Sequence, residues 1–206
     1  VPIIIPGILG VHHLYPLLAA AAVGISQKMS VYDIAKALET YIPPRGRMNI
    51  IPGISGSLII DDTYNSSPAA AHAALDMLKD IKGYKKKIAI FGDMMELGRF
   101  SKEAHIAVGK HAAEAAHMLC TVGLRSRAMA ETALDNGLPE TNVRQYEQGE
   151  SARAGKDLEP ILDKTALVLI KGSQSMRMEK AVEEIIAEPA RAEELLVRQD
   201  ADWKVR

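Results

Sequence analysis

Four short apolar runs of the sequence end in residues of the kinds that bind charged ligands. The first run ends in two adjacent acids, Asp61 and Asp62, and a polar turn follows. Carboxylates, a lysine and hydroxyls gathered at one place would suit a ligand that carries several charges. Each element taken alone also has a structural interpretation, because an aspartate after a strand often caps a helix and Lys171 could cap the last helix. The four sequences are DDTYN (61–65), GDMMELG (92–98), GLR (123–125) and KGSQS (171–175).

Strands and helices are predicted to alternate along the chain, and this order decides where the four polar ends lie. An apolar run without alternation, such as residues 87–93, is typical of a strand buried on both faces. Alternating strands and helices predict an α/β fold with a Rossmann-like, mostly parallel sheet, whose strands end at one edge. The predicted strands are 48–51, 57–61, 87–93, 118–123, 143–146 and 166–172, the first two as a hairpin, and the predicted helices are 68–81, 101–117, 124–136, 150–163 and 178–187.

The first part of the chain is predicted to be separate from this sheet. Residues 14–24 are rich in alanine and leucine, and residues 31–40 follow a capping sequence, so both predict helices. Residues 41–49, YIPPRGRMN, contain two prolines and a glycine and predict a linker or hinge. The chain starts in apolar, motif-like sequence without a leader, which favours a fragment of a longer protein.

Composition and charge exclude several classes of partner. The 206 residues carry a formal net charge of -1 and only 4% aromatic residues, so the sequence predicts no nucleic-acid partner. Its apolar runs are too short to cross a bilayer, and no signal peptide is recognisable, so no membrane partner is expected. The single cysteine, Cys120, fits a reducing, cytoplasmic compartment and is predicted to be a buried structural thiol.

Common nucleotide and metal motifs are missing from the sequence. There is no GxxxxGK[ST] phosphate loop, GxGxxG, HExxH, CxxC or GxSxG. His105, His111 and His117 are spaced by six residues, so one helix would not bring them to the same face. The sequence therefore predicts no metal site, and most of its histidines are expected at the surface or half-buried.

Five segments carry a resemblance to a known family. They are GVHHLYPLLAAAAVG, PPRGRM, DDTYNSSP, GDMMELG and LIKGSQSMRMEKAV, and in this order they resemble the ATP-dependent Mur ligases. The match is best to the type that adds D-alanyl-D-alanine to UDP-N-acetylmuramoyl-tripeptide. The resemblance implies that residues 1–43 end a central ATP-binding domain, and that residues 44–206 form the C-terminal Rossmann-like domain. The predicted linker then coincides with the family's interdomain hinge.

The resemblance also implies roles for individual residues. His12 matches a histidine near the adenine of ATP, and His13 stands where the family usually has an asparagine. Pro16 replaces a second asparagine and offers no side-chain hydrogen bond. Arg47 matches an arginine on the nucleotide phosphates, and Asp62 an aspartate on the ribose; both are predicted to be catalytic as well as cofactor-binding. Residues predicted to surround the incoming dipeptide are Asn65, Asp93, Glu96, Lys171, Ser173 and Ser175.

The reaction implied by the resemblance is the formation of an amide bond in peptidoglycan synthesis through an acyl phosphate. ATP and Mg²⁺ are the implied cofactors, and the ligands of Mg²⁺ are expected mostly outside this chain. UDP-N-acetylmuramoyl-tripeptide and D-alanyl-D-alanine are the implied partners, together with the remaining domains of the ligase. Without a phosphate loop the chain alone is expected to be inactive. Two alternatives stay open: a non-catalytic Rossmann-like binding module, and another amide ligase of the superfamily, such as a folylpolyglutamate synthase.

Overall fold

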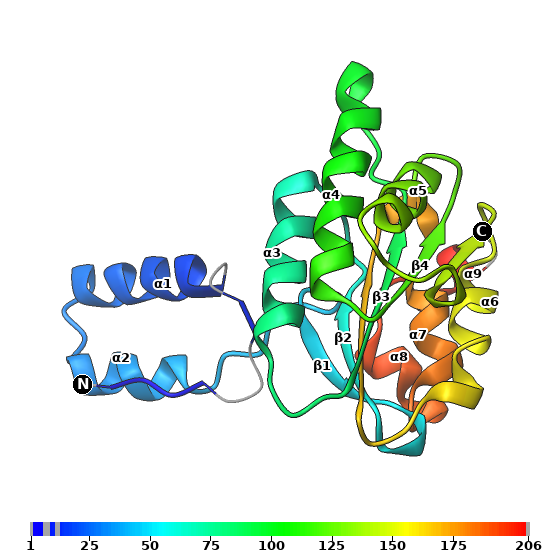
Figure 1. The fold of residues 1–206 in the computed structure, drawn as a ribbon. Coiled ribbons are helices and arrows are strands. Elements are labelled where there is room, and N and C mark those ends of the chain that lie inside the picture. The colour runs from blue at the N-terminus through cyan, green and yellow to red at the C-terminus, as the bar shows by residue number, and fades with distance from the viewer. Residues whose placement is uncertain (1, 6–8, 11–12, 205–206) are drawn as a thin grey trace.

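A six-stranded sheet forms the centre of the molecule. The computed structural model describes residues 2–5, 9–10 and 13–204 (Figure 1). The strands lie in the order β1-β2-β6-β3-β4-β5. β1 pairs antiparallel with β2, and all other pairs are parallel, which confirms the predicted hairpin and the mostly parallel sheet. The strands are β1 (Asn49–Pro52), β2 (Leu58–Asp62), β3 (Lys86–Gly92), β4 (Met118–Val122), β5 (Val143–Tyr146) and β6 (Ala166–Lys171).

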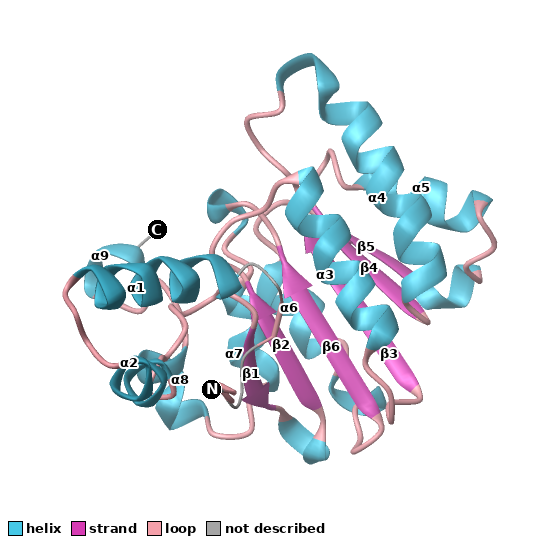
Figure 2. Ribbon diagram, turned by 90° about the vertical axis from the view of Figure 1, so that its left-hand side faces the viewer, coloured by secondary structure: helices cyan, strands magenta, loops and turns pink. Residues whose placement is uncertain are grey.

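Helices cover both faces of the sheet, as the continuous apolar strands predict. Neighbouring residues of a strand point to opposite faces, so Ile60 packs with the first group of helices and Ile59 with the second. Figure 2 shows the first group in front of the sheet and the second behind it. The first group is α3 (Pro68–Asp80), α4 (Ser101–Ala115) and α5 (Arg127–Asp135), and the second is α6 (Ser151–Lys156) and α7 (Glu179–Ile185).

Two of these helices approach each other more closely than side chains allow. Gly109 of α4 lies against the backbone of α5, where an added Cβ would be 2.4 Å from the carbonyl oxygen of Met129.

Cys120 is fully buried on the other side of the sheet, and burial raises the pKa of its thiol to about 12. This confirms the predicted structural thiol, since a thiolate is disfavoured there.

The last part of the chain returns across the sheet edge in short elements. α8 (Ala192–Leu195) and α9 (Ala201–Lys204) are joined by a segment in which Leu196 is fully buried in the core. Short 3₁₀ helices of three residues each lie in the loops of the domain. They are η2 (Ile54–Gly56), η3 (Gly98–Phe100), η4 (Glu140–Asn142), η5 (Glu159–Ile161), η6 (Gln174–Met176) and η7 (Pro189–Arg191).

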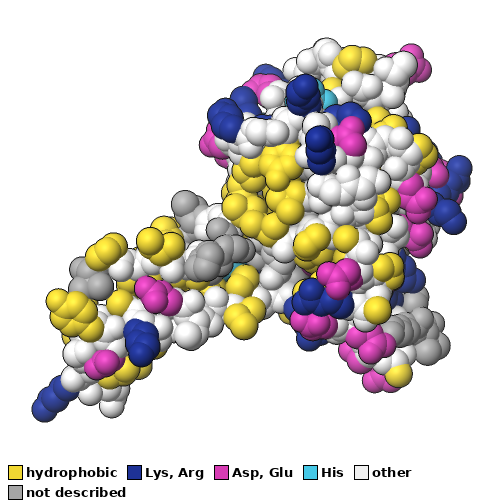
Figure 3. Space-filling view, turned by 90° about the horizontal axis from the view of Figure 1, so that it is seen from below, with side chains coloured by type: hydrophobic (Ala, Val, Ile, Leu, Met, Phe, Trp, Pro, Cys, Tyr) yellow, Lys and Arg dark blue, Asp and Glu magenta, His cyan; other side chains and the backbone are white. Residues whose placement is uncertain are grey.

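An arm of two helices projects from the sheet domain. It consists of α1 (Leu14–Ser26) and α2 (Val31–Leu38), which lie side by side (Figure 1). The Ser30 hydroxyl accepts a hydrogen bond from the Asp33 N–H, so the predicted cap of α2 is formed. Apolar side chains lie on the outside of the arm (Figure 3), and Tyr32, for example, is 75% exposed.

Some predicted helices are shorter in the structure, for local reasons. The predicted helix 150–163 ends at Lys156, because Pro160 lacks the N–H that a continuing helix needs and a 3₁₀ turn follows instead. The predicted helix 124–136 starts only at Arg127, since the residues before it form a turn around Asp93. The predicted helix 101–117 ends at Ala115, which leaves His117 outside it.

Among the five described histidines, His72 and His111 are half-buried and His117 is exposed, as predicted for most of them, whereas His13 and His105 are buried. His105 is fully buried, where its Nδ1–H donates to the carbonyl oxygen of Ser101 and its Nε2 accepts from the N–H of Met94. His105 thereby fastens the loop after β3 to α4. Among the described residues, no group of three or more metal-ligating side chains is found, and no helix is long and apolar enough to cross a membrane.

Candidate active site

The ends of four parallel strands meet at one edge of the sheet. β2 and β6 are adjacent, and their register pairs Asp62 with Lys171. β3 follows β6, and β4 follows β3, so the loops that begin at Asp93 and Gly123 lie along the same edge. The predicted convergence of the four polar strand ends is therefore present.

A buried ion pair lies at the centre of this edge. Lys171 Nζ is 2.6 Å from Asp62 Oδ2 and also donates to the backbone oxygen of Asn65 at 2.9 Å. The side chains of Lys171 and Asp62 are only 2% and 9% exposed. Charge-assisted hydrogen bonds of this length offset part of the cost of burying both charges. The pair thus joins the ends of β2 and β6.

A cleft of about 1260 Å³ opens beside the ion pair, between the helical arm and the sheet domain. Its polar walls include Arg47, Asp62 and Lys171, so these three predicted site residues border one cavity. Its other walls are mostly apolar. They include Leu14, Leu17 and Leu18 of α1 and Ala70, Ala73 and Met77 of α3.

Arg47 stands at the hinge between the arm and the sheet domain. Its guanidinium carbon lies 4.2 Å from the centroid of the Tyr64 ring, a distance suited to a cation–π contact. The N–H of Arg47 donates to Asn49 Oδ1, which fixes the backbone before β1. The guanidinium is thus directed along the turn that follows β2.

His13 has a structural role at the start of α1. It is 3% exposed, and its Nε2 lies 3.1 Å from the carbonyl oxygen of Arg47, to which it must donate. Its Nδ1 lies 3.2 Å from the Tyr41 hydroxyl. Both ring nitrogens therefore tie the start of α1 to the linker. His13 also lines the cleft, and its contact with a nucleotide base stays a prediction. The predicted residue His12 lies outside the described residues.

Asp93 and Ser173 hold neighbouring loops together. Asp93 is 1% exposed, and its carboxylate accepts from the backbone N–H groups of Ser126, at 2.7 Å, and Arg125, at 3.2 Å. It therefore occupies the start of α5, where a negative charge is favourable. The N–H of Ser173 donates to the Asp93 carbonyl, and its hydroxyl accepts from the N–H of Met95. These contacts hold the loops in place, and the contacts of both side chains with a dipeptide stay predictions.

The remaining predicted substrate residues lie on the same edge without lining the cleft. Asn65 has an exposed side chain whose Oδ1 accepts from the N–H of Ser66. Glu96 is exposed in the loop after β3, and Ser175 is exposed in η6. Their contacts with a dipeptide stay predictions.

The other acid of the tandem, Asp61, faces the opposite side of the sheet. It is fully buried, and its Oδ1 accepts from both the N–H and the hydroxyl of Thr63. Its Oδ2 has no hydrogen-bond partner among the described residues. Burial raises the pKa of Asp61 from 3.8 to about 6, because the bonds from Thr63 only partly offset the loss of water.

Asp61→Asn is expected to flatten the pH dependence of stability. The folded state of the wild type binds the Asp61 proton more tightly than the unfolded state, so its contribution is full below about pH 4 and is lost as the pH rises through about 6. The loss is on the order of 2–3 kcal/mol at 1.36 kcal/mol per pKa unit. Urea unfolding of both proteins across this range measures it; parallel pH profiles would contradict the assignment.

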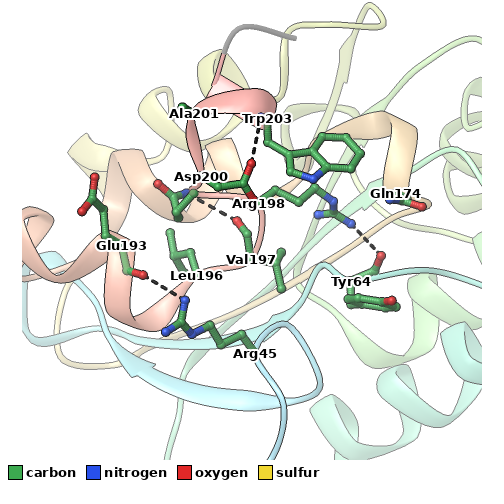
Figure 4. A pocket seen from close by; sticks show the side chains of 11 residues that line it. Arg45, Tyr64, Gln174, Glu193, Leu196, Val197, Arg198, Asp200, Ala201 and Trp203 are labelled. Carbon is green, nitrogen blue, oxygen red and sulfur yellow. Dashed lines mark hydrogen bonds between the residues drawn. The ribbon is translucent and has the colours of Figure 1, made fainter.

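A second, smaller pocket lies on the other side of the turn after β2. It measures about 700 Å³, and its lining includes Arg45, Tyr64, Gln174, Arg198 and Trp203 (Figure 4). None of these was predicted as a site residue, and Arg198 and Trp203 belong to a tail that reads only as mixed and charged. No local signal in the sequence identifies them, because their contacts are to residues far along the chain.

The fold and the site together define a class of protein. A mostly parallel α/β sheet whose charged residues meet at the carboxyl edge, beside a hinged arm, is a ligand-binding domain of the Rossmann-like class. The chain belongs to the Mur ligase family, because its residues 46–174 match the family model described as Mur ligase, glutamate ligase domain.

Individual relatives agree with this family. The UDP-N-acetylmuramoyl-tripeptide--D-alanyl-D-alanine ligase of Bacillus subtilis (strain 168) is 31% identical over 88% of this chain and 39% of its own length. The enzyme of the same name from Escherichia coli (strain K12) is 30% identical over 84% of this chain and 36% of its own. A crystal structure of MurF from Acinetobacter baumannii superimposes with a TM-score of 0.73 at 30% identity, over 88% of this chain and 39% of that one. The chain thus spans less than half the length of these relatives.

Proposed function

We propose that this chain is the C-terminal part of an ATP-dependent ligase that adds D-alanyl-D-alanine to UDP-N-acetylmuramoyl-tripeptide in the cytoplasm. The observation that carries the proposal is the cleft shared by Arg47, Asp62 and Lys171 between the arm and the sheet domain. The names of the relatives support the choice of substrates.

The division of the chain follows from the same proposal. Residues 1–43 would be the end of a central ATP-binding domain, and residues 44–206 the C-terminal domain. The projecting arm supports this division, since Leu18 and Tyr32 would be covered by the rest of such a domain. The cleft would then lie at the boundary between two domains, where ligands often bind.

The residues of the cleft fit a nucleotide. The Arg47 guanidinium suits phosphate oxygens, and a carboxylate such as Asp62 suits the hydroxyl groups of a ribose. ATP, with Mg²⁺ held mostly by the missing domain, would supply the activation of the tripeptide carboxylate. Lys171 would orient Asp62, because its ammonium lies 2.6 Å from Asp62 Oδ2.

Closure of the two domains would complete the site. The hinge places Arg47 on the sheet side, with its carbonyl bound to His13 at the start of the arm. Closure would bring Arg47 and Asp62 onto a nucleotide held by the central domain, and would exclude water from the activated carboxylate. The chain alone is proposed to be inactive.

The test uses the intact protein. We expect phosphate release from ATP that requires both the UDP-linked tripeptide and D-alanyl-D-alanine. Arg47→Met is expected to lower kcat/KM for ATP at least about tenfold, as loss of one charge-stabilising donor does. Arg99→Met is the matched control, because this arginine is exposed and its guanidinium lies over the Phe100 ring, at 4.9 Å. Phosphate release that does not require the dipeptide would rule out the ligase, and an Arg47→Met protein with the wild-type kcat/KM for ATP would rule out the proposed role of Arg47.

A further inference from the structure

The turn after β2 is held by a residue that lies far away in the chain. Residues 63–65, here called the site turn, connect Asp62 to α3. The guanidinium of Arg198 donates to the Thr63 carbonyl oxygen through both Nη1 and Nη2, at 3.2 and 3.1 Å, and to the Tyr64 carbonyl oxygen at 2.6 Å. Figure 4 shows this guanidinium directed at the Tyr64 backbone. The side chain of Arg198 is 5% exposed, whereas its partner Tyr64 is 47% exposed.

Three further backbone groups of the site turn are also bound. The N–H of Thr63 donates to Asp61 Oδ1, and the N–H of Tyr64 donates to the carbonyl oxygen of Gly46 at 3.0 Å. Lys171 holds the carbonyl oxygen of Asn65. The site turn is therefore fixed by two cations, Lys171 from the cleft side and Arg198 from the other side.

A buried carboxylate orients Arg198. Glu179 of α7 is fully buried, and its Oε2 accepts from Arg198 Nη1 at 2.7 Å while its Oε1 accepts from Arg177 Nε. Arg177 also donates to the carbonyl oxygen of Trp203. The Trp203 ring centroid lies 5.3 Å from the Arg177 guanidinium and 5.8 Å from that of Arg198. The indole thus covers both arginines.

The backbone of both arginines is strained. Arg177 has φ 53° and Arg198 has φ 58°, in the left-handed region that side chains other than glycine seldom adopt. Each such residue persists only where its surroundings hold it in this conformation. Two strained residues that converge on one buried glutamate indicate that the position of the Arg198 guanidinium matters.

The Tyr64 ring transmits this position to the cleft. The guanidinium carbon of Arg198 lies 5.9 Å from the centroid of the Tyr64 ring. The guanidinium carbon of Arg47 lies 4.2 Å from the same centroid. Rotation of the peptide between Thr63 and Tyr64 would move the ring, and with it the guanidinium of Arg47. It would also disturb Asp62, which directly precedes the site turn.

We propose that Arg198 is a positioning residue, which sets Arg47 and Asp62 for the nucleotide through the site turn. This inference rests on the proposed function. The contacts of Arg198 with the site turn all lie within the 206-residue chain. The effect of Arg198 on the conformation of the site turn can therefore be tested without measuring ligation.

The first experiment uses the chain alone. Arg198→Lys keeps a positive charge near Glu179 but loses the planar fork that reaches two carbonyl groups. We expect it to shift the amide resonances of Tyr64 and Asn65 and the emission of Trp203, the only tryptophan. Arg191→Lys is the matched control, because Arg191 is an exposed residue paired with Glu194 in the same C-terminal region. Unchanged amide resonances in the site turn of a folded Arg198→Lys protein would overturn the inference.

The second experiment uses the intact ligase. At a temperature where both variants are folded, we expect Arg198→Lys to raise the KM for ATP about tenfold and to leave the KM for the UDP-linked tripeptide unchanged. Arg191→Lys should change neither. If Arg198 had a purely structural role, Arg198→Lys would lower the melting temperature without raising the KM for ATP selectively over the KM for the tripeptide. A wild-type KM for ATP in Arg198→Lys would overturn the inference. If the wild type does not ligate, the proposed function fails, and the first experiment alone decides on Arg198.

Discussion

Lys171→Met is expected to lower the free energy of unfolding of the chain by about 3–5 kcal/mol. The substitution leaves the Asp62 carboxylate buried without its cation, and it removes the donor to the Asn65 carbonyl oxygen. A buried carboxylate that loses its cation costs more than the original pair contributed. Urea unfolding near neutral pH measures the effect.

Two further variants separate this effect from a simple loss of charge. The double variant Asp62→Asn/Lys171→Met should recover part of the lost stability, because no uncompensated charge then remains buried. Lys79→Met removes an exposed pair with Glu114, whose side chains are 48% and 57% exposed, and should cost less than about 1 kcal/mol. Equal losses for Lys171→Met and Lys79→Met would show that the Lys171 pair is not buried in solution.

Gly109→Ala is expected to destabilise the chain by about 3 kcal/mol or more. The new Cβ would meet the Met129 backbone at 2.4 Å from its oxygen and 2.6 Å from its Cα. Backbone atoms inside α5 cannot rotate away as a side chain does, so α4 and α5 must separate. Thermal and urea unfolding of the two proteins measure the loss.

The sign of this result is informative, because alanine favours helices. In an exposed helix position, the change from glycine to alanine stabilises by about 1 kcal/mol. Ala107→Gly, at an exposed position of the same helix, calibrates this propensity in reverse and should cost about 1 kcal/mol. A Gly109→Ala protein as stable as the wild type would mean that the two helices do not touch here.

The sheet, and the edge at which its polar strand ends meet, follow from local patterns. Continuous apolar runs predicted six strands within one or two residues, whereas the pairing of β2 with β6, which brings Asp62 beside Lys171, was not predicted. The resemblance added Arg47, which the structure places on the same cleft. The position of each of these residues is fixed by a strand end or by the linker, and both kinds of segment can be recognised from a few consecutive residues of the sequence.

Other site features could not be predicted, because they depend on distant partners. Asp93 looks like a ligand in the sequence, and only the start of α5 beside it reveals a cap. Asp61 and Asp62 are adjacent letters, yet the alternation of the strand sends them to opposite faces. Arg198 lies in a C-terminal segment without a recognisable sequence pattern. Its role depends on contacts with Glu179 and Thr63, which cannot be inferred from the residues next to it in the sequence.

The long sequence separation of the contacts that hold the site turn has a consequence for biosynthesis. Thr63 and Arg198 are 135 positions apart, and Asp62 and Lys171 are 109 positions apart. The site turn leaves the ribosome long before Lys171 and Arg198 are synthesised. The nascent chain can therefore pair β1 with β2 while neither cation is yet present to hold the turn. A messenger that stops between the end of α7, at Ile185, and Arg198 would encode every strand and Lys171 but would lack one of the two cations. Translation of almost the whole region is therefore the condition for the geometry of the site.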